Sequence, residues 1–216
     1  MYIVIIGDII ASKKLSNRAE VQDHLEKVLE QINDEYQDFI ASKFIITIGD
    51  EFQGVLMEGT KLLEIIDKIR FMMDEINLRF GIGIGDIYTK INYELSIGAD
   101  GPAYWKAREA INYIHEHNDF KRTNLRIEAD QIECNLINEL LGLCGYIEST
   151  WQNSQKDLIK KIILKYGYDL KIKQVEIARD FELSTQNVYL RLKKIGYHNY
   201  VRSRIQICSF LSQWEE

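Results

Sequence analysis

The segment FIITIGDEFQGVLM, residues 44–57, consists of two apolar runs on either side of a Gly49-Asp50 pair. A Gly-Asp pair favours a tight turn, and short runs rich in Ile, Val and Phe favour strands over helices. The segment therefore predicts a β-hairpin. Because a hairpin joins neighbouring antiparallel strands, it limits where the elements before and after it can lie in the sheet.

The elements on both sides of the hairpin follow one alternating order. Residues 2–7 and 78–84 are short runs rich in β-branched residues, and each predicts a strand. Residues 18–36 and 60–77 carry apolar side chains at the i, i+4, i+7 spacing of an amphipathic helix. The resulting order, β-α-β-β-α-β, is the ferredoxin-like arrangement.

Beyond residue 86 the pattern predicts a mixed region followed by a helical one. Residues 94–97 and 125–127 predict short strands, residues 103–115 predict a helix, and the chain from residue 131 predicts helices nearly to its end. The expected fold class is therefore α+β, a ferredoxin-like domain followed by an all-α domain. The expected parts are an N-terminal domain at 1–130, a connecting helix at 131–150 and a C-terminal helical domain at 151–216.

The 216-residue chain has an ordinary globular composition, with 46% hydrophobic and 28% charged residues. Its net charge of −6 is unevenly distributed. Residues 1–150 contain 15 Lys and Arg against 26 Asp and Glu, a net charge of −11, whereas residues 151–216 contain 12 against 7, a net charge of +5. An acidic body with a basic C-terminal segment indicates two modules with different partners.

The same composition argues against several classes of protein. No apolar run approaches the roughly 18 residues that a membrane span needs, and no basic, signal-like stretch precedes the first strand. The cysteines Cys134, Cys144 and Cys208 lack the paired spacing of a disulfide framework or a zinc site. We therefore expect a cytoplasmic protein with no membrane partner.

Two carboxylates are expected at one edge of the predicted sheet. Asp8 ends the first strand and Asp50 lies in the hairpin turn, and the crossover between the first two strands places both at the same edge. A divalent cation such as Mg²⁺ takes oxygen ligands from a few carboxylates and leaves positions for water and phosphate. We hypothesise that Asp8 and Asp50 bind Mg²⁺. The alternative is that they serve only as a helix cap and a turn residue.

The loop after Asp8 carries groups that suit a phosphate. Ser12, Lys13 and Arg18 offer a hydroxyl group and two cations, and a predicted helix begins beside them. His115 and His117 are two residues apart near a predicted helix end, where they do not share a face. We expect the two histidines to be a solvated C-terminal cap and not ligands.

Three motifs resemble the SatD family of bacterial proteins: IGDIIAS at 6–12, IGDEFQG at 48–54 and GADGPAYWKAR at 98–108. More distantly, the first 125 residues resemble the class III nucleotidyl cyclases and the diguanylate cyclases. In those enzymes an Asp at the end of the first strand and an acidic hairpin residue hold two Mg²⁺ ions on a nucleoside triphosphate. The resemblance implies Asp8 and Asp50 as metal ligands, with Glu51 as a helper and the Ile9 carbonyl as a backbone ligand.

The third motif has two readings. Under the resemblance, the segment 99–104, with Asp100, Gly101 and Pro102, shapes the wall of a nucleotide pocket. Alternatively Pro102, the only proline of the chain, simply begins a helix.

The sequence departs from the cyclases where those enzymes hold the base and the transition state. Phe44 stands where adenylyl cyclases have a base-reading Lys, and Ile48 replaces the first Gly of the diguanylate cyclase hairpin. Ala103 and Ala107 fall near the positions of the transition-state Asn and Arg. Losing such donors costs on the order of 10²–10³ in rate for each group. We therefore expect nucleotide binding with little turnover.

The basic C-terminal segment has the spacing of a helix-turn-helix motif. Residues 156–166, 173–181 and 184–195 predict three helices with a short turn around residue 182, and Val188 and Leu192 should face inward with Ile195. The alternative is a solvated three-helix bundle that binds no DNA. The residues expected on the DNA-facing side are Ser184, Thr185, Gln186, Asn187, Tyr189, Arg191, Lys193 and Lys194.

Two further expectations concern the end of the chain. Arg202 and Arg204 are suited to contact DNA phosphates. Residues 202–214 predict a last helix whose apolar stripe either closes the bundle or pairs two subunits.

These features predict a DNA-binding transcriptional regulator. Its cyclase-like domain would bind a nucleotide with Mg²⁺ as a sensor, and a homodimer would read double-stranded DNA. One alternative is an active nucleotidyl cyclase or nucleotide hydrolase that the helical domain regulates. A second alternative is a dimeric interaction module in which both motifs are vestigial.

Overall fold

The computed structural model describes residues 1–117, 123–130 and 134–213 and confirms the α+β fold class. Within these residues the sheet has five strands in the order β2-β3-β1-β4-β5. β1 pairs antiparallel with both β3 and β4, β2 pairs antiparallel with β3, and β4 pairs parallel with β5. The strands are β1 (Tyr2–Ile9), β2 (Ile40–Ile48), β3 (Glu51–Leu56), β4 (Leu78–Gly85) and β5 (Leu125–Ala129).

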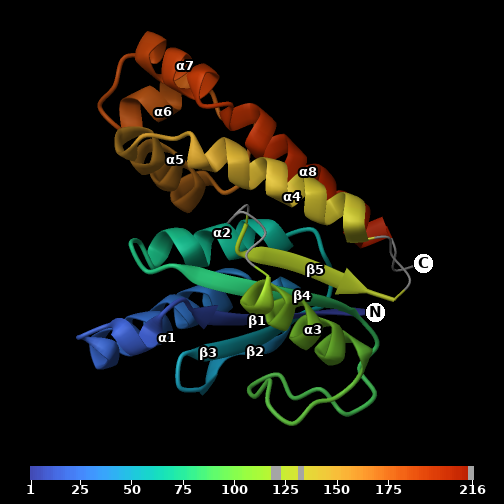
Figure 1. Ribbon diagram of the computed structural model, residues 1–216. Helices are drawn as coiled ribbons and strands as arrows, with labels where there is room; N and C mark the ends of the chain where they lie inside the picture. Colours follow the sequence, from blue (N-terminus) through green and yellow to red (C-terminus); the bar gives the residue numbers. More distant parts are fainter. Residues whose placement is uncertain (118–122, 131–133, 214–216) are drawn as a thin grey trace.

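The described chain also contains eight α-helices, of which α6 and α7 lie farthest from the sheet (Figure 1). α1 and α2 alternate with the first four strands, α3 connects β4 to β5, and α4 to α8 follow β5. The helices are α1 (Arg18–Glu35), α2 (Leu62–Met72), α3 (Pro102–Glu116), α4 (Cys134–Ser149), α5 (Asn153–Tyr166), α6 (Gln174–Asp180), α7 (Thr185–Lys194) and α8 (Tyr197–Ser212). Short 3₁₀ helices at Ser12–Lys14 and Gln37–Phe39 complete the elements.

β1 is buried on both faces because helices cover both sides of the sheet. Its side chains alternate between the faces, as in any strand. Ile3 and Ile5 join the larger core, which includes the inner sides of α1 and α2. Val4 and Ile6 join a smaller core with Ala107 of α3. This double burial explains why the sequence of β1 is continuously apolar.

α3 packs very close to β4. A Cβ atom at Gly83 would lie 2.0 Å from the Ala103 carbonyl oxygen, and one at Gly81 would lie 2.5 Å from the carbonyl oxygen of Ala107. Glycine is therefore required on this face of β4, since any side chain would push the helix backbone away from the strand.

An asparagine side-chain amide hydrogen-bonds with the backbone of each outer strand of the sheet, β2 and β5. Asn33 of α1 accepts from the backbone N–H of Phe44 in β2 at 2.8 Å and donates to its carbonyl at 2.9 Å. Asn138 of α4 makes the same pair of bonds with Ile127 of β5, both at 2.9 Å. Both outer strands thus find partners for backbone groups that would otherwise be free to pair with another chain.

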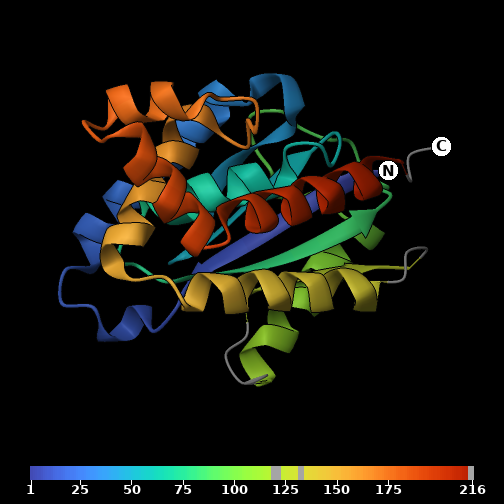
Figure 2. The ribbon, with the colours of Figure 1, turned by 90° about the horizontal axis from the view of Figure 1, so that it is seen from above.

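The C-terminal helices form a further layer over α2. α5 and α8 pack on α2, whereas α4 packs on α8 and β5. Figure 2 shows α4 and α8 running over the sheet when seen from above. The predicted connecting helix corresponds to α4, although its first residues, 131–133, lie outside the described chain. No helix within the described residues is long and apolar enough to span a membrane.

Three predicted boundaries or elements were wrong. Residues 94–97 form no strand, because Ser96 there bonds with Gln53 of β3 through side chains and not through a strand ladder. α2 ends at Met72, well before residue 77, since Asp74 turns the backbone to a positive φ of 55°. α8 begins at Tyr197, earlier than residue 202, directly after Gly196 reverses the chain at φ 65°.

Candidate functional site

The carboxylate of Asp8 is held by two basic side chains. Asp8 lies near the end of β1, opposite Arg79 of β4 in the strand register. Arg79 Nε donates to Asp8 Oδ1 at 2.8 Å, and His115 Nε2 of α3 lies 2.8 Å from Asp8 Oδ2. Both oxygens of this largely buried carboxylate therefore have a cationic or N–H partner.

The two ring nitrogens of His115 have different roles. Arg79 Nη1 lies 2.8 Å from His115 Nδ1, and a guanidinium can only donate. Nδ1 therefore accepts, which assigns the ring proton to Nε2 and makes Nε2 the donor to Asp8. The prediction that His115 is only a solvated cap was wrong. His117 does lie at the helix end, with Nδ1 3.0 Å from the carbonyl oxygen of Tyr113.

Glu51 is held in a similar way at the start of β3. Arg108 of α3 donates to both oxygens of Glu51, at 2.5 Å and 2.8 Å. This hydrogen bonding raises the pKa of Arg108 above its ordinary value. Asp50, in the adjacent turn, is half-buried and makes no hydrogen bond or ion pair within the described chain.

This arrangement does not fit a Mg²⁺ site. Asp8 and Glu51 direct their oxygens at Arg79, His115 and Arg108, and a metal would have to displace these partners. Among the described residues no group of three or more His, Cys, Asp or Glu side chains is placed to hold a metal. The Ile9 side chain is buried in the core, and Ile9 pairs with Leu78 in the sheet.

The predicted nucleotide-binding residues lie at opposite ends of the sheet. Ser12, Lys13 and Arg18 follow the end of β1, beside Asp8. Asp100, Gly101 and Pro102 come at the end of the loop that follows β4. Gly85, the last residue of β4, pairs with Tyr2 at the start of β1. The strand between these ends is about 20 Å long, at roughly 3.3 Å for each residue. One chain therefore does not bring the two sets into one pocket.

Asp100 and its neighbours build the start of α3. Asp100 Oδ1 accepts from the backbone N–H of Gly101 at 2.9 Å and from Trp105 Nε1 at 2.7 Å. Gly101 has φ of 150°, and a Cβ there would lie 2.7 Å from the Asp86 carbonyl oxygen. Pro102 is the first residue of the helix, where its missing N–H costs nothing.

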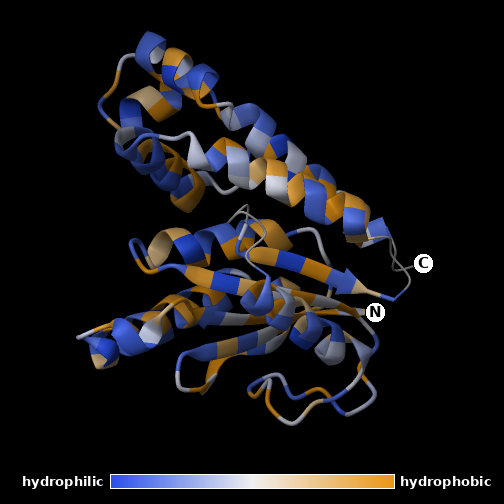
Figure 3. Ribbon diagram, viewed as in Figure 1, coloured by the Kyte–Doolittle hydropathy of each residue, from blue (hydrophilic) through white to orange (hydrophobic). Residues whose placement is uncertain are grey.

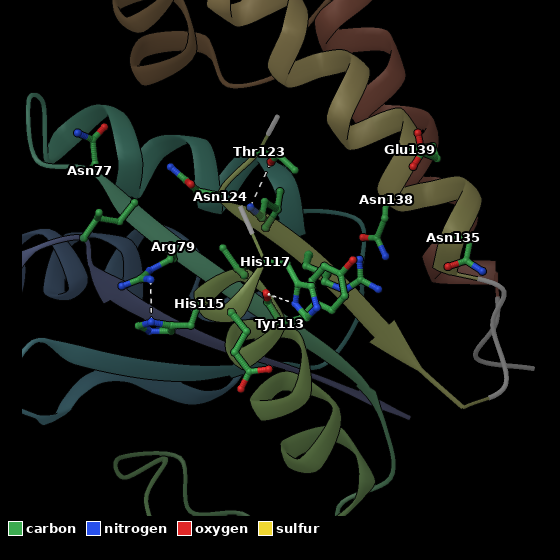
Figure 4. A pocket seen from close by; sticks show the side chains of 15 residues that line it. Asn77, Arg79, Tyr113, His115, His117, Thr123, Asn124, Asn135, Asn138 and Glu139 are labelled. Carbon is green, nitrogen blue, oxygen red and sulfur yellow. Dashed lines mark hydrogen bonds between the residues drawn. The ribbon is translucent and has the colours of Figure 1, made fainter. Parts of the chain in front are cut away.

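A polar cavity of about 740 Å³ lies next to the Asp8 cluster (Figure 4). It lies among the end of α3, the starts of β4 and β5, and α4, and it shares Arg79 and His115 with the cluster. The rings of Tyr113 and His117 stack with centroids 4.1 Å apart, and the Arg126 guanidinium lies 3.7 Å from the Tyr113 centroid. Its size is within the range of ligand pockets.

α6 and α7 form a compact helical pair joined by residues 181–184. Leu183 N–H donates to the Ala178 carbonyl at 2.8 Å, which fixes the turn. Ser184 caps α7, its Oγ accepting from the backbone N–H of Asn187 at 3.2 Å. The sequence-based prediction of a cap at Ser184 is confirmed.

The two faces of α7 differ sharply in burial. Val188 and Leu192 are buried, as is Ile195 just after the helix, and these three predictions are confirmed. The half-buried residues of the predicted DNA-facing set are Asn187 and Arg191. The exposed members of that set are Ser184, Thr185, Gln186, Tyr189, Lys193 and Lys194.

Arg204 does not lie on this surface. It is 3% exposed, and its guanidinium donates to Asp67 of α2 through Nη2 at 2.8 Å and to Tyr168 Oη through Nε at 2.7 Å. The prediction that Arg204 contacts DNA phosphate was therefore wrong, because its guanidinium is bonded to Asp67 and Tyr168 in the protein interior. Arg202 is exposed, as expected.

The partners of the acidic residues were not predicted from the sequence. Arg79, Arg108 and His115 are separated from Asp8 and Glu51 by 57 to 107 positions, and no local spacing relates them. One signal was available for Asp67: it stands in the apolar run of a helix, although Glu64 and Lys68 are buried there as well. A charge at such a position requires a buried partner.

The fold and these sites describe an α+β protein with basic C-terminal helices packed on an acidic body. The chain belongs to the SatD family, because the protein-family model described as SatD family matches residues 2–211 of its sequence. No match was found among curated proteins.

Proposed function

We propose that this protein is a DNA-binding transcriptional regulator that reads double-stranded DNA with α7. In this proposal α6 and α7 are a helix-turn-helix motif, and residues 1–130 are a ferredoxin-like, nucleotidyl-cyclase-like domain. The observation that carries the proposal is that one side of α7 is buried and the other is exposed. Its buried side anchors the helix, while Thr185, Gln186 and Tyr189 are exposed in its first half, where recognition helices meet base edges.

The charge around α7 supports contact with phosphates. Lys193 and Lys194 are exposed at its C-terminal end, and Lys171 and Lys173 are exposed just before α6. Cations at such positions add affinity without sequence preference. The polar residues of the first half of α7 would then supply the preference for particular bases.

The N-terminal domain is proposed as the sensor of a nucleotide. The cavity beside Asp8 has a suitable volume and is lined by Arg79, Arg126 and the Tyr113–His117 stack, with Arg79 also bonded to Asp8 and Arg126 to Glu128. We assign no step to Mg²⁺, since the carboxylates expected to hold it are paired with basic residues. For the same reason the geometry favours sensing over the alternative of cyclase or hydrolase activity.

The protein is proposed to act as a cytoplasmic homodimer. Helix-turn-helix proteins commonly bind two half-sites about one helical turn of DNA apart. A ligand that prefers one dimer geometry would change the affinity for DNA through linkage.

Selection from a pool of random-sequence duplexes tests the DNA proposal. The full-length protein should enrich a defined motif, and fluorescence anisotropy should then show tighter binding to it than to a shuffled duplex. Gln186→Ala should lose this preference, whereas Lys27→Ala, an exposed substitution on α1 of the N-terminal body, should keep it. A wild-type protein that enriches no sequence would refute the proposal.

A thermal-shift screen tests the sensor separately. A nucleotide that binds the folded state raises the unfolding temperature. Replacing Arg126 with Ala should remove that rise if the ligand occupies the cavity.

A further inference from the structure

α4 is apolar on two sides, and only one of them is covered. Ile137, Leu141 and Cys144 are buried in the main core. The opposite side carries the outer row, which consists of Leu136, Leu140, Leu143 and Tyr146, exposed by 67%, 36%, 57% and 69%. In Figure 3 α4 carries orange bands along the side facing the viewer. A continuous apolar side of a helix is normally buried against a partner.

The spacing of the outer row forms one continuous stripe. Its members are separated by four, three and three positions, and residues at such spacings share a helix face. From Leu136 to Tyr146 the stripe runs for about 15 Å, at 1.5 Å for each residue. The row is therefore a contiguous apolar surface and not a set of isolated exposed side chains.

The charges of α4 indicate what kind of partner fits the row. The helix contains no Lys or Arg, and its acidic residues are Glu139 and Glu148. Glu148 is turned inward, where Arg70 Nη2 donates to it at 2.6 Å. DNA and anionic membranes would find no cation here to neutralise their phosphates. The surface that best complements an uncharged apolar row is another uncharged apolar row.

The rest of the chain restricts how two copies can approach. Residues 1–150 have a net charge of −11, so most faces of the N-terminal body repel their counterparts in a second copy. The outer row carries less of that charge, because Glu139, three positions after Leu136 and four before Leu143, is the one acidic residue of α4 exposed on its side.

We propose that the outer row is the homodimer interface, formed by antiparallel packing of α4 from two copies across a two-fold axis. An axis near Leu141 and Gly142 pairs Leu136 with the partner's Tyr146, and it pairs Leu140 with the partner's Leu143. Each contact occurs twice, as a two-fold interface requires. Four apolar side chains from each copy then meet, and Glu139 of each copy lies beside them at the edge of the contact.

This interface would also position the DNA-reading helices. α4 packs on α8, and only two residues separate the end of α7 from the start of α8. The separation of the two α7 helices would therefore follow from the geometry of the α4 pair. This consequence depends on the proposed DNA-reading role, whereas the interface rests only on the proposed homodimer.

Sedimentation velocity from 1 to 100 µM tests the interface. The wild-type protein should be a dimer, and Leu140→Lys with Leu143→Lys should raise the dimer dissociation constant at least 100-fold. Ile48→Lys is the matched control, because Ile48 is 81% exposed but lies at the end of β2, on another part of the fold. A wild-type monomer at 100 µM, or a double variant as dimeric as wild type, would overturn the proposal. Tyr146→Ala should weaken the dimer if the double variant fails to fold.

Disulfide cross-linking tests the antiparallel orientation. The three native cysteines are buried, so introduced cysteines should report alone. A mixture of Leu136→Cys and Tyr146→Cys proteins should form cross-linked dimers, and neither protein should do so efficiently by itself. Cross-linking of each variant alone, with none specific to the mixture, would contradict the arrangement. A monomer that still binds single DNA half-sites would reject this interface and leave the DNA-reading role standing.

Discussion

Arg204 of α8 and Asp67 of α2 form a fully buried ion pair, with Nη2 2.8 Å from Oδ1. Tyr168 and Tyr200 add hydrogen bonds to Asp67 Oδ2 at 2.5 Å and 2.8 Å, and Arg70 reaches Oδ1 at 3.0 Å. Burial raises the pKa of both tyrosines well above their ordinary value, so both remain donors. This network attaches the C-terminal helices to the N-terminal body.

Asp67→Ala should destabilise the fold by about 3–5 kcal/mol, because removing one member of a buried pair leaves the other charge without a partner. Urea denaturation followed by circular dichroism measures this free energy of unfolding. The control is Asp157→Ala, which removes an exposed ion pair with Lys161 within α5 and should cost less than about 1 kcal/mol. Equal costs for the two variants would show that the network does not hold the two parts together.

Ser184→Ala should lower the free energy of unfolding by about 1 kcal/mol, since it removes the N-cap of α7. Ser16→Ala, in an exposed loop before α1, is the matched control and should have little effect. The two denaturation midpoints can be compared directly if the slopes agree. A cost for Ser184→Ala no larger than that of the control would mean that α7 does not depend on this cap.

Adding MgCl₂ should not raise the unfolding temperature of the wild-type protein. The carboxylates of Asp8 and Glu51 are already bonded to Arg79, His115 and Arg108, and a metal must displace them. A ligand of the folded state always raises that temperature. A Mg²⁺-dependent rise that Asp8→Asn abolishes would restore the metal site that the sequence predicts.

The three cysteines should be inert toward Ellman's reagent in the native protein at pH 8. Burial raises the pKa of the Cys208 thiol to about 11 and also raises that of Cys144, and Cys134 is buried as well. The reactive thiolate is therefore scarce and inaccessible until the protein unfolds. Because the fold favours the protonated thiol, this contribution to stability is lost as the pH rises above 9, the ordinary thiol value. Rapid labelling of one thiol in the native state at pH 8 would contradict this burial.

Local patterns predicted most of the elements. Apolar periodicity located α1, and the Gly49-Asp50 pair located the β2–β3 turn, because both depend on residues close in sequence. The prediction of a strand at 94–97 was wrong for the opposite reason. Its Ser96 is held by bonds to Gln53, more than 40 positions away, and no local pattern encodes such contacts.

The candidate sites divide along the same line. The buried and exposed faces of α7 follow from spacing within one helix, so Val188 and Gln186 were placed correctly. The environment of Asp8 depends on Arg79 and His115, which only the folded sheet and α3 bring to it. Arg204 is of the residue type that contacts phosphate, but it is bonded instead to Asp67, which is 137 positions away in the sequence.

The most direct test of the account is the affinity of the protein for its selected duplex as a function of salt. Gln186→Ala should cost about 1–3 kcal/mol of specific binding and leave the salt slope unchanged, whereas Lys193→Ala should lower that slope by about one. Fluorescence anisotropy with wild-type protein and both variants measures these quantities. If neither variant differs from wild type, or if wild type prefers no duplex over a shuffled one, α7 does not read DNA.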